Sequence, residues 1–338
     1  MLVKRGQSGL CCIVGVDKPQ GKSSHDIVNA CRRIFGERRV GHTGTLDPLA
    51  TGALAICVGP ATRLDAYMVN HDKVYDVRIS FGVATDTDDA MGQPIRTAQV
   101  PAKVCNPAFA QEFVKGLVGK HKQLPPAYSA IKKGGVKPYE AARAGNVIQL
   151  EPRDIEIYAA ELRGLETDPA AESLYWDVRV AVSKGTYIRS LARDIGAALD
   201  SAAHVEVLRR VVAGRLDVED CLTLEELEQR GLDAAIDPVF ILGYRMAFLT
   251  DEQAADVQNG KIVRMRDLKF YDAPVRYDSS DCGPRRAAHE TQAPLFPGET
   301  ISLVHGNELK ALYQVDAVKP LLRPACVFPQ GVIRGKGF

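Results

Sequence analysis

The chain is organised around one stretch, Gly41-His42-Thr43-Gly44-Thr45-Leu46-Asp47-Pro48-Leu49-Ala50-Thr51-Gly52. Three glycines and one proline within these twelve residues exclude a regular helix or strand. The short apolar run that follows, Ala53–Gly59, predicts a buried strand. The carboxylate of Asp47 is therefore expected on a tightly turning loop beside the core, where a rigid scaffold can present a catalytic group.

Asp47-Pro48 alone is weak evidence, because Asp-Pro commonly forms a turn. The same dipeptide occurs at Asp168-Pro169 and Asp237-Pro238, where we expect only turns. The longer stretch His42–Gly52 is far more specific, and it resembles the signature of the TruB family of tRNA pseudouridine synthases. The resemblance implies that Asp47 is the catalytic nucleophile.

Composition indicates a globular protein. A length of 338 residues suggests about two domains, and 46% hydrophobic with 25% charged residues is ordinary for such a chain. The net charge is only +1, but residues 1–64 carry nine basic and four acidic residues, a local charge of +5. A basic half can hold phosphates while the remainder keeps the chain near neutral. A solvated surface explains the same charges equally well.

The eight cysteines favour reduced thiols in the cytoplasm. None forms a C-x-x-C pair, so we expect no zinc or other metal. Several lie in apolar runs, where a reduced cysteine packs as a small hydrophobic side chain. We find no signal peptide and no membrane-length apolar run, and expect a cytoplasmic protein without membrane contact.

A strand over Cys11–Val16 and a helix beginning at Ser23 are expected before the central loop. Ser23 and Asp26 have the spacing of a capping box, with Asp in place of Glu. The turn Lys18–Gly21 between these elements also resembles the TruB family, and the resemblance places Lys18 among the residues that bind substrate.

The run Val74–Phe81 alternates between apolar and polar residues, which predicts a strand. Its apolar face includes Tyr75, and the pattern alone favours a core tyrosine whose hydroxyl needs a partner. The resemblance instead implies that Tyr75 is an active-site residue. The acidic loop Thr85–Gly92 that follows looks calcium-like but lacks the spacing and terminal Glu of an EF-hand. The family has a similar loop, so we expect a structural role for it.

The segment over about residues 120–150 is basic and contains Lys120, Lys122, Lys132, Lys133, Lys137 and Arg143. Lysines interleaved with aromatic residues suit an element that grips a nucleic-acid backbone, although a floppy loop is an equal alternative. The run Gln123–Ile131 with Tyr139–Arg143 resembles the family's thumb insertion, which embraces the tRNA arm. The resemblance makes Lys132 and Lys133 candidate substrate-binding residues.

Another strand is expected over residues 174–182, followed by a turn and a helix with Thr186 as its N-cap. Arg189 falls in the first turn of that helix, where a cation opposes the helix dipole, so a carboxylate or phosphate partner is expected. Lys184–Arg189 resembles the family's second motif, which implies that Arg189 pairs with Asp47 and that Tyr187 lines the uracil pocket. The run from Ala203 to Arg210 resembles a third motif of the family, which implies that Leu208 closes the uracil pocket.

Pseudouridine formation breaks the bond from ribose C1′ to uracil N1 and joins C1′ to C5. This isomerisation requires no metal, nicotinamide or ATP, and we find no cofactor motif. An adjacent Arg189 would favour the ionised form of Asp47. The sequence leaves open whether Asp47 attacks uracil C6 or ribose C1′, or promotes elimination to a glycal. In the glycal route Tyr75 takes the C2′ proton; otherwise it orients the base.

The target base must leave its stack, which costs on the order of a few kcal/mol. His42 is expected to fill the vacated space or to stack on the extruded base; a loop histidine bonded to the backbone is the alternative.

We expect an α+β fold with a mixed, mainly antiparallel sheet and flanking helices over residues 1–243. A small β-rich, PUA-like domain is expected over residues 244–338, with a loop or insertion at about 272–299. The resemblance implies that the chain converts the uridine at position 55 in the T arm of tRNA to pseudouridine. We expect a monomer, although the sequence does not reveal the oligomeric state. The alternatives are an RNA-binding chaperone that folds tRNA without catalysis and an unrelated hydrolase with a carboxylate nucleophile, which leaves the basic clusters unexplained.

Overall fold

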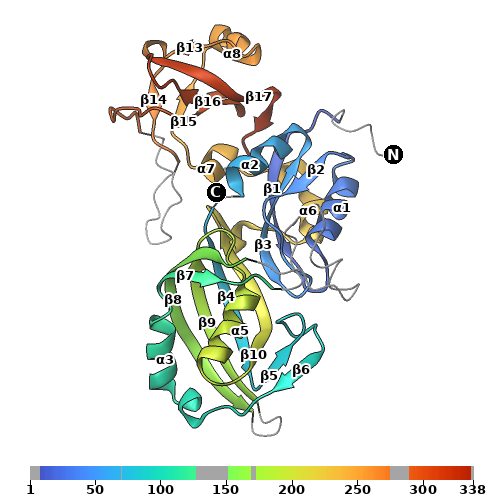
Figure 1. Ribbon diagram of the computed structural model, residues 1–338. Helices are drawn as coiled ribbons and strands as arrows, with labels where there is room; N and C mark the ends of the chain where they lie inside the picture. Colours follow the sequence, from blue (N-terminus) through green and yellow to red (C-terminus); the bar gives the residue numbers. More distant parts are fainter. Residues whose placement is uncertain (1–7, 70, 127–150, 169–172, 275–288, 336–338) are drawn as a thin grey trace.

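The computed structural model describes residues 8–69, 71–126, 151–168, 173–274 and 289–335 (Figure 1). These residues form a nine-stranded sheet, a six-stranded sheet and a two-stranded ribbon of β5 (Val83–Thr85) and β6 (Pro94–Thr97). Helices flank the larger sheet, and most strand pairs are antiparallel. The expected α+β class is confirmed.

The larger sheet contains the motifs quoted above. Its strand order is β1 (Cys12–Lys18), β3 (Thr51–Val58), β10 (Ala203–Ala213), β4 (Lys73–Phe81), β9 (Ser173–Val182), β8 (Arg153–Asp168) and β7 (Gly119–Gln123), with β2 (Val40–His42) beside β3 and β11 (Leu216–Asp217) beside β10. Among the described pairs of this sheet, β3 and β10 alone run parallel. This parallel contact brings the end of the central loop beside β10.

Helices α1 (Ser24–Ile34), α3 (Pro107–Lys115), α5 (Ile188–Ala198) and α6 (Leu224–Arg230) pack their apolar stripes into one core with the sheet. The expected capping box is present, because the Ser23 side chain accepts from the backbone of Asp26 and the Asp26 side chain accepts from that of Ser23. Tyr75, Val77, Ile79 and Phe81 are buried in this core, which confirms the predicted face of β4.

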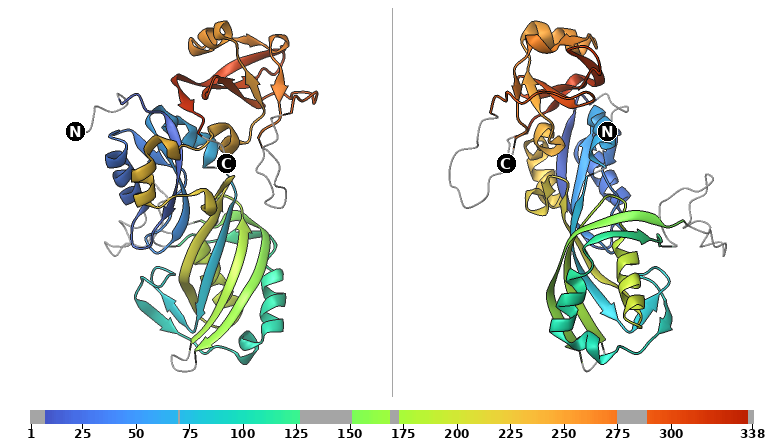
Figure 2. Two further views of the ribbon diagram at one scale, coloured as in Figure 1. Left: turned by 180° about the vertical axis from the view of Figure 1, so that it is seen from behind. Right: turned by 60° about the vertical axis from the view of Figure 1, so that its left-hand side comes forward.

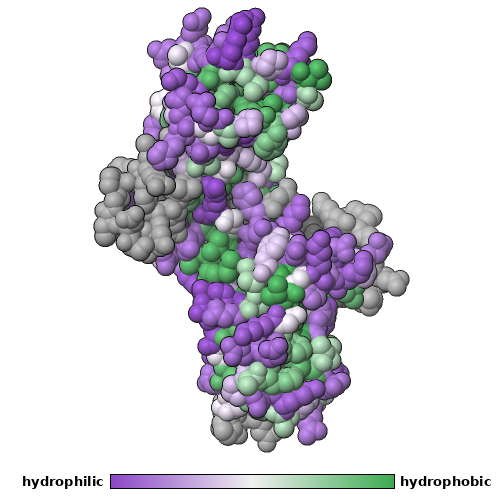
Figure 3. All heavy atoms as spheres, turned by 90° about the vertical axis from the view of Figure 1, so that its left-hand side faces the viewer, coloured by the Kyte–Doolittle hydropathy of each residue, from purple (hydrophilic) through white to green (hydrophobic). Residues whose placement is uncertain are grey.

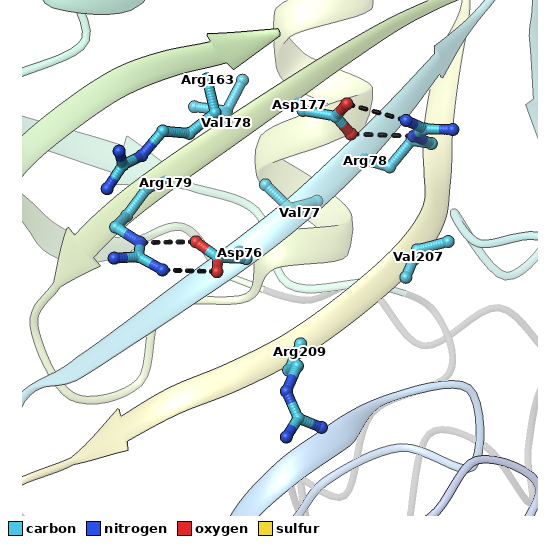
Figure 4. Close-up of a pocket in the computed structure, with 9 residues that line it drawn as sticks. All are labelled: Asp76, Val77, Arg78, Arg163, Asp177, Val178, Arg179, Val207 and Arg209. Carbon is cyan, nitrogen blue, oxygen red and sulfur yellow. Dashed lines mark hydrogen bonds and ion pairs between the residues drawn. The ribbon is translucent and has the colours of Figure 1, made fainter. Parts of the chain in front are cut away.

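The opposite face of β4 and β9 carries two cross-strand ion pairs (Figure 4). Arg179 donates Nε and Nη2 to the Asp76 carboxylate at 2.6 Å each, and Arg78 contacts Asp177 in the same way at 2.8 Å each. They line an open hollow of about 630 Å³. Because these side chains are partly solvated, each pair is expected to contribute only about 0–1 kcal/mol.

The six-stranded sheet is built from the C-terminal part of the chain. Its order is β13 (Val263–Arg264), β17 (Leu321–Ile333), β16 (Glu308–Val315), β15 (Thr300–His305), β12 (Met246–Phe248) and β14 (Phe270–Tyr271), with α8 (Asp251–Gln258) beside it. The strands expected near residues 301–304 and 311–315 are confirmed. The sequence did not reveal β17, because Pro324 and Pro329 interrupt the strand pattern. Strand β13 pairs only with Leu321 and Leu322 of β17, so both prolines lie beyond this short pairing. A missing backbone N–H is tolerated at such a strand edge.

The two sheets share a hydrophobic core. Its buried members come from both, and include Cys11, Ile13, Ala53 and Leu64 on one side and Val304, Leu312, Phe328 and Val332 on the other. Arg63 donates Nη1 to the Val327 carbonyl at 2.7 Å and lies 5.8 Å from the Phe328 ring centroid. Figures 1 and 2 show α2 (Asp65–Met68) and α7 (Pro238–Leu242) between the two sheets. The C-terminal sheet therefore covers apolar surface of the larger one.

Among the described residues, no helix is both long enough and apolar enough to cross a membrane. On the face seen in Figure 3, hydrophobic residues are interspersed among hydrophilic ones.

The shared core predicts that the two sheets unfold together. Phe328→Ala removes a ring that is 1% exposed, and should lower the free energy of unfolding by about 3–5 kcal/mol. Trp176, the one tryptophan of the chain, lies buried in the larger sheet, so its fluorescence should report this loss in urea titrations. Phe296→Ala is the control, because Phe296 is 61% exposed. If the urea midpoint reported by Trp176 fluorescence is the same in Phe328→Ala as in the unchanged protein, the two sheets unfold independently.

Candidate active site

A cleft of about 310 Å³ opens beside the central loop. Its lining comes from the loop, from β4, from the start of α5 and from β10, and consists of Gly44, Thr45, Asp47, Val69, Lys73, Tyr75, Gly185, Thr186, Tyr187, Ile188, Arg189, Leu208 and Arg210. Five of the residues selected from the sequence therefore meet in one place: Asp47, Tyr75, Tyr187, Arg189 and Leu208.

The central contact is an ion pair between Arg189 and Asp47. The Nε atom of Arg189 lies 2.9 Å from Oδ2 of Asp47, and its side chain is 6% exposed against 38% for Asp47. Arg189 also donates Nη1 to the Thr87 carbonyl at 2.8 Å, and Oδ2 of Asp89 lies 3.8 Å from its Nε. A buried guanidinium at a helix N-terminus thus gains anionic and carbonyl partners, while Asp47 stays accessible from the cleft.

Some polar groups of the acidic loop Thr85–Gly92 bond one another. Asp89 accepts from the Thr87 hydroxyl at 2.6 Å and from the Met91 backbone at 3.0 Å. No group of three or more potential metal ligands occurs among the residues that the structure describes. The loop therefore serves to present the Thr87 carbonyl and Asp89 to Arg189.

The start of α5 differs from the sequence prediction. Tyr187, and not Thr186, occupies the N-cap, and no side chain caps the helix. The Thr186 hydroxyl instead donates to the Ser183 carbonyl at 2.9 Å, which closes the preceding turn. The Gln123 amide bonds both backbone groups of Tyr187, donating to its carbonyl at 3.0 Å and accepting from its N–H at 2.8 Å. Gln123 thereby fixes the backbone of Tyr187 beside the cleft.

Buried Arg210 holds the central loop, a role that sequence reasoning missed. It is 1% exposed and donates Nε to the Ala53 carbonyl at 2.8 Å and Nη2 to the Gly44 carbonyl at 3.2 Å. From the other side, the Ser24 hydroxyl bonds the N–H and carbonyl of Leu46 at 2.8 and 3.0 Å. Arg210 was quoted only as part of a motif, because its burial depends on strands that are distant in sequence.

Lys73 is a further cation of the cleft that the sequence did not single out. Its ammonium group donates to the carbonyls of Val69, at 3.2 Å, and His71. Burial lowers the pKa of Lys73 to about 8, with the nearby Arg210 acting in the same direction. Only the position of Lys73, two residues before Tyr75 on β4, could have suggested its place at the cleft.

Two residues expected to bind substrate do not line the cleft. Lys18 is fully buried and donates to the carbonyls of Pro19 and Lys22 at 3.0 and 2.5 Å, and burial lowers its pKa to about 8. Lys18 thereby supports the turn Lys18–Gly21. The Gly21 N–H of this turn donates to the Pro48 carbonyl of the central loop at 2.8 Å. A direct contact of Lys18 with substrate stays a prediction.

His42 lies at the end of β2, and burial lowers its pKa. Its Nδ1 atom is buried without a hydrogen-bond partner among the described residues. Lys132, Lys133 and residues 127–150 of the expected thumb lie outside the described residues.

Comparison with known proteins identifies the family. Residues 32–188 match the N-terminal domain of TruB family pseudouridylate synthases, and residues 189–239 match the C-terminal domain of tRNA pseudouridylate synthase B. The chain is 38% identical over 267 residues to tRNA pseudouridine synthase B of Geobacillus thermodenitrificans. The aligned region covers 77% of this chain and 88% of that protein. The chain belongs to the TruB family of pseudouridylate synthases. It is therefore an enzyme of the isomerase class.

A second relative and a solved structure are also similar to this chain. The tRNA pseudouridine synthase B of Mycobacterium ulcerans is 41% identical over 250 residues, covering 74% of this chain and 82% of that protein. A chain in the crystal structure of a Cbf5-Nop10-Gar1 complex has a TM-score of 0.65 and 22% identity, over 96% of this chain and 86% of that one. At this identity the likeness concerns the fold, and it extends over both sheets.

The loop of this TruB-family enzyme should not tolerate a side chain at Gly52. Its φ is +105°, and an added Cβ would lie 2.2 Å from the Arg210 carbonyl oxygen. Gly21 is the matched control, because its φ is +81° and its surroundings are open. Gly21→Ala should cost about 1–2 kcal/mol of stability. Gly52→Ala should cost more and abolish pseudouridine formation, as measured by urea unfolding and a tritium-release assay. Equal effects of the two changes would contradict a close approach at Gly52.

Proposed function

We propose that this enzyme isomerises the uridine at position 55 in the T arm of tRNA, with Asp47 as the nucleophile. The central support is the accessible Asp47 carboxylate, held 2.9 Å from the buried guanidinium of Arg189 within the cleft. The relatives named tRNA pseudouridine synthase B support tRNA as the substrate. A carboxylate is the kind of side chain that can act as the nucleophile of this reaction.

The size of the cleft supports base flipping as part of the proposal. A volume of about 310 Å³ is at the lower end for small-molecule sites, so the cleft suits one nucleoside and not a folded RNA arm. The target base must therefore leave its stack before it can reach Asp47. His42 remains our candidate for filling the vacated space.

We assign proton transfer, orientation of the base and enclosure of the uracil to other residues of the cleft. Tyr75 lies on the buried side of the cleft, where its hydroxyl takes the C2′ proton in a glycal route or its ring orients the base. Tyr187 and Leu208 enclose the uracil from α5 and β10. The product has the same atoms as the substrate, so no co-reactant enters the balance of the reaction.

Substrate binding is proposed to rest on phosphate contacts. The positive charge of residues 1–64 and the cations Lys73 and Arg210 at the cleft favour a polyanion. Lys132 and Lys133 remain predicted phosphate contacts, and the C-terminal sheet is proposed to be a PUA-like RNA-binding domain.

All seven described cysteines are free thiols, which supports a cytoplasmic location. A monomer remains our expectation.

Asp47→Asn tests the nucleophile. The change keeps the shape of the side chain but removes its charge, and an amide is a far poorer nucleophile than a carboxylate. We expect no detectable pseudouridine in a tritium-release assay on uracil-5-labelled tRNA transcript, while tRNA affinity stays within about tenfold because phosphate contacts supply much of it. Asp177→Asn, which disrupts a comparable ion pair on the opposite face, is the matched control and should remain active. Robust turnover by folded Asp47→Asn would overturn the proposal, and an RNA chaperone would show no isomerisation in any variant.

Tyr75→Phe distinguishes two roles of the tyrosine. If the hydroxyl is a general base, the single-turnover rate at saturating tRNA should fall by about a hundredfold or more. If the ring only orients uracil, the rate should stay near that of the unchanged enzyme. We expect the protein to stay folded, because the ring fills the same buried space.

A further inference from the structure

A second arginine of α5 lies behind the Asp47–Arg189 pair. Arg193 follows Arg189 by four residues, so both project from the same side of the helix. It donates Nη1 to Oδ2 of Asp88 at 3.0 Å and Nη2 to the Leu124 carbonyl at 2.8 Å. Its Nε contacts the neighbouring Asp194 at 3.0 Å. Arg193 is not among the residues that line the cleft.

Its partner Asp88 has an unusual backbone. The φ of Asp88 is +60°, in the left-handed region that residues other than glycine seldom adopt and that Asp tolerates better than most. The Asp88 N–H donates to the Thr85 carbonyl at 3.3 Å, and its carbonyl accepts from Val205 of β10 at 3.1 Å. Its carboxylate is 13% exposed, and burial raises its pKa.

This backbone geometry bears directly on Arg189. The Thr87 carbonyl, which accepts from Arg189 Nη1 at 2.8 Å, belongs to the peptide that joins Thr87 to Asp88. The direction of that carbonyl therefore depends on the conformation of Asp88. An ion pair that holds the Asp88 carboxylate also holds the acceptor that orients Arg189.

Arg193 also bonds the backbone next to the residue that holds Tyr187. Leu124 follows Gln123, the residue whose amide bonds both backbone groups of Tyr187. One guanidinium thus connects α5, the acidic loop and the end of β7, three segments that are distant in sequence.

We propose that Arg193 is a positioning residue for the isomerisation. By fixing Asp88, it keeps the Thr87 carbonyl where that group holds Arg189 against Asp47. By fixing Leu124, it keeps Gln123 where its amide holds Tyr187 beside the cleft. Arg193 contacts no reacting atom, and its effect passes through Arg189 and Tyr187. This inference rests on the proposed function, because it assumes that Asp47 and Arg189 form the reacting site.

The test compares Arg193→Gln, Arg193→Lys and the unchanged enzyme in pseudouridine formation on tRNA transcript. Arg193→Gln should lower kcat by about ten- to a hundredfold, because small displacements of catalytic groups are costly, and leave KM within about twofold. Arg193→Lys should recover part of kcat, since one ammonium group can pair with Asp88 but cannot span to Leu124 as well. Arg163→Gln is the matched control, because Arg163 pairs with Glu161 at 3.3 Å on the face opposite the cleft.

Thermal unfolding of every variant separates positioning from loss of fold. If Arg193→Gln does not fold, Asp88→Asn takes its place, since Asn tolerates the same backbone but carries no charge, and it should lower kcat in the same way. An unchanged kcat in the folded variant, a loss confined to KM, or a lysine variant no better than glutamine would overturn the inference. An unchanged enzyme that makes no pseudouridine on the transcript would instead overturn the proposed function, and the inference with it.

Discussion

The ion pair between Arg189 and Asp47 is the constraint on which the rest of the site depends. A guanidinium that is 6% exposed, in the first turn of a helix, is unfavourable unless anionic groups surround it. The fold supplies Asp47 from the central loop, together with Asp89 and the Thr87 carbonyl from the acidic loop. Removing any of these would leave the buried guanidinium with fewer partners, so the placement of the Arg189 side chain depends on three segments.

The parallel contact between β3 and β10 decides where those segments meet. It pairs Thr51 and Gly52 with Arg209 and Arg210, and thereby sets the end of the central loop against β10. Only glycine allows so close an approach at position 52, and the approach lets Arg210 reach back to the Gly44 carbonyl. The contact that joins β3 to β10 within the sheet thus also shapes the loop that carries Asp47.

The shared core gives the C-terminal sheet a structural as well as a proposed RNA-binding role. Buried residues of β15, β16 and β17 cover apolar side chains of β1 and β3, and Arg334 forms a bidentate pair with Asp237 near the end of the chain. The stability of the catalytic region therefore depends on residues far from the cleft. Changes in the C-terminal sheet are expected to affect both folding and substrate affinity.

Local patterns in the sequence were sufficient for several of the elements and for the motif residues. The alternation of Val74–Phe81, the capping box at Ser23 and the glycine-rich loop at Asp47 each follow from the conformations that neighbouring residues can adopt. The resemblance to the TruB family added which of these residues belong to a site.

Tertiary structure alone decided the supporting contacts. Nothing local marks Arg210 as buried, Lys73 as part of the cleft, Gln123 as the clamp on Tyr187, or Lys18 as support for a turn. The pairing of β17 despite its prolines likewise depends on which of its edges faces a neighbour. A sequence determines the preferences of adjacent residues, whereas burial and hydrogen bonding of these groups depend on partners that only the folded chain brings within reach.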